Sequence, residues 1–298
     1  MTKRATTNAL AVRLAQLRDQ ASDDALRGRY ADSAALLRRA LRLITSQGTS
    51  QTSEHLALWN ELGMVYKYLG KFQTAQEFYR LALHHSAECL KGRERNEFLA
   101  NLYHNLGGLE HSRRQFSSGE QYARKSLRFR AKIAAANSIA VASDKVALAA
   151  ILDGLGKFDE SQKLYRQALR TYRRVYGQSH REIALILNNL AAIFQTLGQP
   201  SRAETLYRAS LAMKRRELGK SHPDLAVTLN NLAMLYASMG KSKSARLFFD
   251  RSLKLLAHSL GNSHPSTRAV ERNLRNIHTI SRSRPTPAGK SSSRQKQR

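Results

Sequence analysis

The stretch Asn230-Asn231-Leu232-Ala233-Met234-Leu235-Tyr236, followed by Gly240 and by Ala245-x-x-x-Phe249, decides the fold because the rest of the chain repeats it. Its leucine recurs every 42 residues, since Leu190 precedes Leu232 by that distance and Leu274 follows it by the same distance. A fixed period of this size is typical of a solenoid, in which each repeat is one supersecondary unit stacked on its neighbours. The 298 residues are therefore expected to form one elongated domain.

The repeated leucine and a turn glycine keep a common phase toward the start of the chain. The leucine series continues through Leu148, Leu106 and Leu62, with one spacing of 44 residues between the last two. The glycines of the series are Gly28, Gly70, Gly156, Gly198 and Gly240, and Arg114 replaces the glycine once. Apolar residues at helical spacing lie on both sides of each turn, which predicts two helices in every repeat.

The composition favours a helical protein without disulfides or membrane spans. Hydrophobic residues make up 42% of the chain, and only 5 residues are proline. The single cysteine, Cys89, cannot form an internal disulfide, so a cytoplasmic location is expected. No apolar run is long enough to cross a membrane. Met1 to Arg18 is basic, but it lacks a continuous apolar core, so a first helix is favoured over a targeting segment.

The repeat resembles a known family. Trp59-x-x-Leu62-Gly63-x-x-Tyr66, followed by Gly70 and Ala75-x-x-x-Tyr79, is similar to the tetratricopeptide helix-turn-helix pattern, in which the small residue after leucine admits the second helix closely. The 42-residue length and the linker Gly219-x-Ser221-His222-Pro223, which recurs at Gly261, resemble the repeats of kinesin light chains. The resemblance implies an all-α, right-handed superhelical solenoid.

Three segments follow from this interpretation. Residues 1–28 are expected to form an N-terminal capping helix, and residues 29–280 a tetratricopeptide solenoid of about six repeats. Residues 281–298 are rich in Ser, Pro, Gly, Gln and basic residues, which predicts a disordered basic tail.

Catalytic and metal sites are not favoured. His85 and Cys89 lie one helical turn apart and could share a metal, but two ligands do not make a site. His180, His222 and His264 belong to the repeated linker, where a role in capping the next helix explains them. No phosphate-binding loop or nucleophile motif is visible, so we expect neither an enzyme nor a cofactor.

The resemblance implies that the first helix of each repeat lines a concave groove. Helical spacing then places these residues in the groove: Asn60, Met64, Lys67, His104, Gly108, His111, Val146, Ala150, Asp153, Asn188, Ala192, Gln195, Asn230, Met234 and Ala237. Lys67, His104 and His111 would favour acidic side chains on a protein or peptide partner.

Four asparagines, Asn105, Asn189, Asn231 and Asn273, each precede the repeated leucine. In kinesin light chains and their relatives the matching asparagines hydrogen-bond the backbone of an extended peptide, and the resemblance implies the same role here. The alternative is that these side chains only satisfy neighbouring helices. Glu61 and Ala147 interrupt the series.

The chain carries a formal charge of +28. The expected second helices contain 28 basic and 9 acidic residues, and eight further basic residues lie from Arg272 to Arg298. Such a surface attracts polyanions, so nonspecific nucleic-acid binding by the outer face and tail is the alternative to peptide binding in the groove. The bland alternative to polyanion binding is a merely basic surface without a ligand. A third possibility is self-association, since the final helix could leave one end of the repeat stack uncovered.

Overall fold

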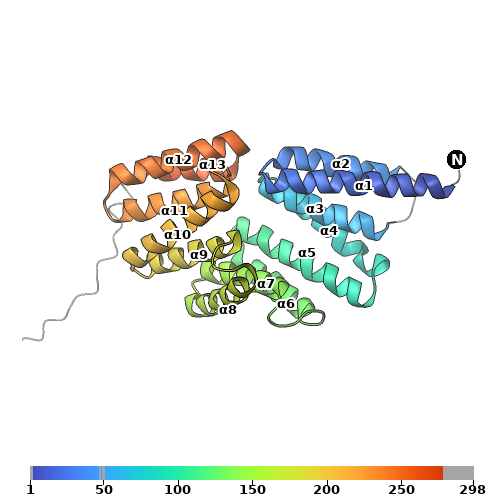
Figure 1. Cartoon of the computed structure of the whole chain (residues 1–298), viewed down its shortest axis with the longest axis horizontal. Coiled ribbons are helices and arrows are strands. Elements are labelled where there is room, and N and C mark those ends of the chain that lie inside the picture. Colours follow the sequence, from blue (N-terminus) through green and yellow to red (C-terminus); the bar gives the residue numbers. More distant parts are fainter. Residues whose placement is uncertain (1–2, 47, 49–50, 278–298) are drawn as a thin grey trace, which may run out of the picture.

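The computed structural model describes residues 3–46, 48 and 51–277, and over these residues it is helical without strands (Figure 1). The predicted all-α fold is thus confirmed. The helices are α1 (Lys3–Leu26), α2 (Tyr30–Thr45), α3 (Ser53–Tyr68), α4 (Phe72–Cys89), α5 (Gly92–Ser112), α6 (Phe116–Arg130), α7 (Ile139–Gly154), α8 (Phe158–Tyr176), α9 (Arg181–Thr196), α10 (Pro200–Leu218), α11 (Asp224–Ser238), α12 (Ser242–Leu260) and α13 (Pro265–Arg275).

Consecutive helices form six hairpins, α1 with α2 through to α11 with α12, and α13 packs on α12. The helix expected to act as a cap, α1, is therefore paired with α2 in the same manner as the later first helices. The predicted tail, residues 281–298, lies outside the described residues. Among the described helices, none has the length and apolar content needed to cross a membrane.

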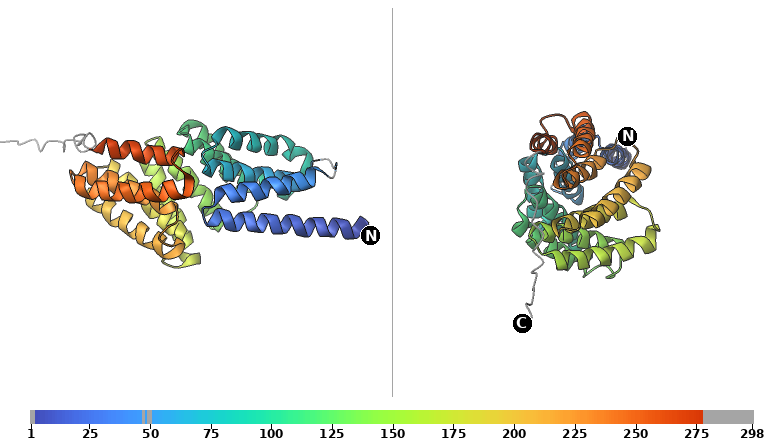
Figure 2. Two further views of the ribbon diagram at one scale, coloured as in Figure 1. Left: turned by 90° about the horizontal axis from the view of Figure 1, so that it is seen from above. Right: turned by 90° about the vertical axis from the view of Figure 1, so that its left-hand side faces the viewer.

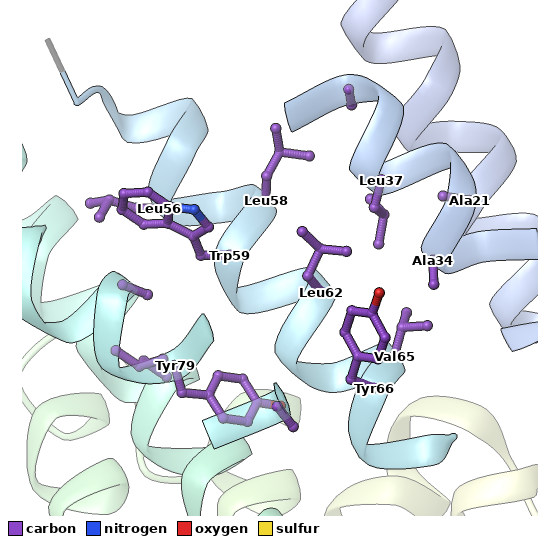
Figure 3. Packing of buried hydrophobic residues seen from close by; sticks show 14 of the residues in the cluster. Ala21, Ala34, Leu37, Leu56, Leu58, Trp59, Leu62, Val65, Tyr66 and Tyr79 are labelled. Carbon is purple, nitrogen blue, oxygen red and sulfur yellow. The ribbon is translucent and has the colours of Figure 1, made fainter. Parts of the chain in front are cut away.

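In four of the six hairpins among the described residues, a ring on the second helix packs behind the small residue of the first, whereas Leu37 and Ala123 hold that position in the other two. Tyr79, Tyr165, Tyr207 and Phe249 recur at this position and are fully buried. Gly63 faces Tyr79 so closely that an added Cβ would lie 2.4 Å from a ring carbon. Figure 3 shows this core around α3, where Leu62 is directed toward Leu37 of α2 and Tyr79 lies on another side of the helix.

The turn inside each hairpin needs a left-handed residue. The glycines of the series adopt positive φ, for example +77° at Gly28 and +71° at Gly70. Arg114, the one replacement, takes the same conformation with φ of 62°, although a side chain makes it unfavourable there. The turn therefore keeps its backbone conformation in the repeat in which arginine replaces glycine.

The linkers between late hairpins cap the helices that follow them. Nδ1 of His180, His222 and His264 accepts a backbone N–H two residues further on, from Glu182, Asp224 and Ser266 at 3.3, 3.2 and 3.1 Å. The predicted capping role of these histidines is therefore confirmed.

The hairpins wind around a common axis, as the view along the long axis shows (Figure 2). Neighbouring odd-numbered helices contact each other directly from α3 to α11, whereas each even-numbered helix packs mainly on the odd-numbered helices before and after it. The odd-numbered helices thus form the inner wall of the superhelix, and the even-numbered helices form its outer layer.

We expect Gly63→Ala to destabilise the protein by about 1–3 kcal/mol, because the buried Tyr79 ring has no room for an added methyl group. Gly107 holds the equivalent position in the next repeat, but an added Cβ there would make ordinary contacts at 3.5 Å and beyond. Gly107→Ala is therefore the control, and it should be neutral or slightly stabilising. Urea unfolding of both variants checks this, and equal losses would contradict the packing described.

We also expect the free energy of unfolding to decrease as the pH falls from 7.5 to 5.5. Burial lowers the pKa of His264, although its bond to the Tyr68 carbonyl acts in the opposite direction. The unfolded chain then takes up a proton that the folded chain disfavours, so stability is lost as the pH falls through about 6.5. His264→Asn retains a capping oxygen but does not titrate, and its urea unfolding should depend less on pH. Identical pH profiles would contradict this role.

Candidate functional site on the inner wall

A chain of hydrogen-bonded asparagine amides runs along the inner wall from α9 to α13. Asn189 donates to the Tyr165 hydroxyl at 2.9 Å and accepts from Asn188 at 3.2 Å. Asn231 then donates to Asn188 at 3.3 Å and accepts from Asn230 at 3.4 Å. Asn273 closes the series by donating to Asn230 at 3.1 Å. Five side chains from three helices thus form one continuous amide ladder.

Exposure differs along this ladder. Asn188 is only 3% exposed, whereas Asn189, Asn230, Asn231 and Asn273 are partly exposed. The expectation that Asn188 lines the groove is therefore corrected: its amide is the buried link between two repeats. Val146 and Ala237, also expected in the groove, are buried as well.

A separate amide pair lies near the start of the inner wall, where Asn105 of α5 donates to Asn60 of α3 at 2.9 Å. Glu61, which interrupts the asparagine series, forms an ion pair with Arg18 of α1. The interruption is thus explained by a contact to the first hairpin. Both asparagines of this pair are partly exposed.

Lys67 and His111 follow each other on the inner wall, in α3 and α5. The Lys67 ammonium lies 4.2 Å from the centroid of the Tyr68 ring. Burial lowers the pKa of His111, and the charges of Lys67 and Arg114 lower it further. The lowered pKa favours the neutral form of His111, so Lys67 is the stronger source of positive charge at this position.

His104, also expected to attract acidic partners, already has one inside the protein. Its Nδ1 lies 2.8 Å from Oδ1 of Asp144, and Arg130 donates to the other oxygen at 2.9 Å. Asp144 is 1% exposed and Arg130 7% exposed. Although burial opposes it, the bonds from His104 and Arg130 keep the pKa of Asp144 below its ordinary value. His104 therefore serves a structural network between α5, α6 and α7.

Two cations counted with the outer surface are in fact buried. Besides Arg130, Lys214 is 5% exposed and donates to the Asp224 carbonyl and the Thr228 hydroxyl at 3.2 and 3.1 Å. Burial lowers the pKa of Lys214. These two residues belong to the contacts between hairpins, which corrects their assignment to the basic face.

Asp153 is the one inner-wall acid that the groove prediction included without assigning it a role. It holds the same position in α7 that Gln195 holds in α9, and burial raises its pKa to about 6. Burial raises the pKa of the Tyr165 and Tyr207 hydroxyls, and the negative charge of Asp153 raises it further, so both side chains lie near Asp153. The inner wall thus carries a cation at Lys67 and an acid at Asp153, two repeats apart.

His85 and Cys89, the pair weighed as metal ligands, are engaged in other contacts. His85 pairs with Glu88 at 3.2 Å and packs against the Trp59 ring, and the Cys89 thiol faces the Gln51 carbonyl at 3.3 Å. Across the part of the chain that the structure describes, no three His, Cys, Asp or Glu residues are grouped as metal ligands would be.

The fold and its amide-lined inner wall define a helical repeat protein of the solenoid class. Tetratricopeptide repeat models match residues 56–83, 138–216 and 182–258. The chain belongs to the tetratricopeptide repeat family. Comparison with curated proteins gives no match.

Solved structures share this fold at low sequence identity. BtubC (BKLC) from P. vanneervenii is 24% identical, with a TM-score of 0.52, over 80% of this chain and 92% of that one. A Rap protein complexed with Competence and Sporulation Factor has a TM-score of 0.67 at 15% identity, over 91% of this chain and 76% of that one. NprR in complex with its cognate peptide NprX has a TM-score of 0.62 at 15% identity, over 89% of this chain and 76% of that one.

We expect Asp144→Ala to cost about 3–5 kcal/mol of stability, because Arg130 would remain buried without its carboxylate partner. Glu160→Ala is the control, since that carboxylate is 42% exposed and its pair with Arg124 should contribute at most about 1 kcal/mol. Thermal or urea unfolding checks the difference.

The double variant Arg130→Leu/Asp144→Val reproduces the apolar pair Leu256 and Val270, which holds the same two positions later in the repeat series. It should recover most of the lost stability. A double variant as unstable as Asp144→Ala would show that the cost does not arise from an unpaired cation.

Proposed function

We propose that this protein is a non-enzymatic scaffold whose inner wall binds an extended segment of a partner protein. The observation that carries this proposal is the amide ladder from Asn189 to Asn273. It presents a row of identical groups that match a peptide backbone and are indifferent to side-chain sequence.

The ladder keeps the capacity to bind a backbone although its members bond one another. An asparagine amide has two N–H groups, and its oxygen has two lone pairs. Asn231 uses one N–H toward Asn188 and one lone pair toward Asn230, and Asn189 is engaged in the same manner. Counting only the bonds made among the described residues, one donor and one acceptor remain on each. Both side chains are partly exposed, so these groups are available to a peptide bond.

The charges of the inner wall give the bound segment a direction. Lys67 favours an acidic side chain near α3 and α5, and Asp153 favours a basic one near α7 and α9. Because Asp153 is partly desolvated, a cation beside it would lower its pKa from about 6 and stabilise its charged form. A segment with charges of both signs therefore fits better than a uniformly acidic one.

The solved structures support this proposal through their ligands. Two proteins that share this fold were solved as complexes, a Rap protein with Competence and Sporulation Factor and NprR with its cognate peptide NprX. Their low identity makes them evidence on the fold, and the ladder supplies the chemistry for this chain.

We expect the double variant Asn189→Ala/Asn231→Ala to bind its peptide about tenfold or more weakly, since each lost hydrogen bond contributes about 0.5–1.5 kcal/mol. A displayed library of random peptides, panned against the wild-type protein, supplies the ligand, and fluorescence anisotropy measures its affinity. Asn137→Ala is the control, because Asn137 is exposed and lies between α6 and α7, away from the ladder. Melting temperatures of all three proteins separate loss of binding from loss of folding.

Equal affinities in the double variant and the wild type would overturn the groove assignment. Polyanion binding has its own signature, because phosphate contacts weaken steeply as salt rises from about 50 to 200 mM. Peptide affinity that collapses over this range, or that heparin abolishes, would favour the basic outer face instead.

A further inference from the structure

Two linkers of the C-terminal half touch two turns of the N-terminal half. Nε2 of His222 lies 3.0 Å from the Leu26 carbonyl oxygen, and Nε2 of His264 lies 2.9 Å from that of Tyr68. Each pair is separated by 196 residues, and the two contacts are offset by one repeat. Figure 1 shows the ends of the orange helices facing the ends of the blue ones at this point.

Both nitrogens of the His222 ring and of the His264 ring make hydrogen bonds. Nδ1 accepts the backbone N–H that begins the next helix, so the proton of the neutral ring sits on Nε2. That nitrogen therefore donates to the facing carbonyl. Leu26 and Tyr68 end α1 and α3, where carbonyl oxygens have no partner within their own helix. Each histidine thus caps the start of one helix and the end of another.

The prolines beside these histidines fit against glycines. A Cβ added at Gly28 would lie 2.8 Å from Cγ of Pro223, and one at Gly70 would lie 2.5 Å from Cδ of Pro265. The same test at the later turn glycines, which are Gly156, Gly198 and Gly240, finds open space. Within this series of turn glycines, only the two that face a His-Pro linker are covered, and Pro223 itself is buried.

Neighbouring side chains extend the contact. Leu260, at the end of α12, packs against the core clusters of both the N-terminal and the C-terminal hairpins. Burial raises the pKa of Tyr30 at the start of α2, and the charge of Asp224 adds to this, which places the start of α11 beside the first turn.

We propose that the pairs Leu26–His222 and Tyr68–His264, with their prolines, form a closure that holds the superhelix shut and controls lateral entry of a partner segment. Stacked hairpins are held by continuous apolar cores, but the closure consists of a few local contacts. Repeat arrays are stabilised between nearest neighbours, so the closure can open while every hairpin remains folded. Its control of entry rests on the peptide binding proposed above, whereas its existence does not.

The test uses His222→Asn/His264→Asn. Asparagine still caps a helix start, but it is too short to reach the carbonyl across the closure. His180→Asn is the matched control, because His180 makes the same cap while its ring stacks on Tyr176 at 3.8 Å instead of crossing to another turn. All variants carry Cys89→Ser, together with Arg27→Cys and Lys220→Cys for spin labels on exposed sites that flank the closure.

Pulsed electron spin resonance should give one short, narrow label distance for the parent protein and the His180→Asn control. The double variant should add a longer, broad population, and small-angle X-ray scattering should show a larger radius of gyration. A distance distribution unchanged from the parent would overturn the closure. Because no ligand is present, this result is independent of whether the inner wall binds peptides.

A second arm tests entry. A bifunctional maleimide that joins the two introduced thiols, one on each side of the closure, would lock it. Association of a long chain that carries the selected peptide in its middle should then slow about tenfold or more, while the short peptide alone enters along the axis unimpeded. Equal rates for the long chain before and after cross-linking would overturn control of entry.

Discussion

The structure depends on one contact that recurs in four of its six described hairpins: a small residue of the first helix against a buried ring of the second. At Gly63 and Tyr79 the approach leaves no space for a methyl group, and at Ala191 and Tyr207 it accommodates one. This contact fixes how deeply the two helices interlock, because protein interiors transmit small changes in volume. Every later feature, from the curvature of the inner wall to the meeting of its two ends, is the accumulated result of these stacked hairpins.

Curvature follows from the difference between the two helices of a hairpin. First helices contact their counterparts in the next repeat directly, and the second helices are held apart on the outside. The wall therefore bends toward the first helices until the linkers of α11 and α13 reach turns that lie 196 residues earlier. His180, His222 and His264 all cap the helix that follows them, and two of them, His222 and His264, also bridge the superhelix because of their position in it.

The sequence allowed the repeat, the hairpins and the capping histidines to be predicted, because each depends on residues close together in the chain. It could not predict the closure, since no local pattern reports a contact between Gly28 and Pro223. The buried cations were missed although a signal existed. Arg130 and Lys214 stand where other repeats place Tyr172 and Leu256, and a basic residue at an apolar repeat position indicates a polar partner such as Asp144 or Thr228.

The inner-wall asparagines show why one residue type can satisfy two demands that looked like alternatives from the sequence. A stack of hairpins needs polar groups that join neighbouring repeats without strain, and a binding surface needs polar groups left unsaturated. A charged or hydroxyl side chain would serve one demand at the expense of the other. The amide has four hydrogen-bonding positions, and the ladder uses two at Asn189 and Asn231. Because the bonds between repeats also fix the amide orientations, the remaining groups are held in place before a peptide arrives, which reduces the entropy lost on binding.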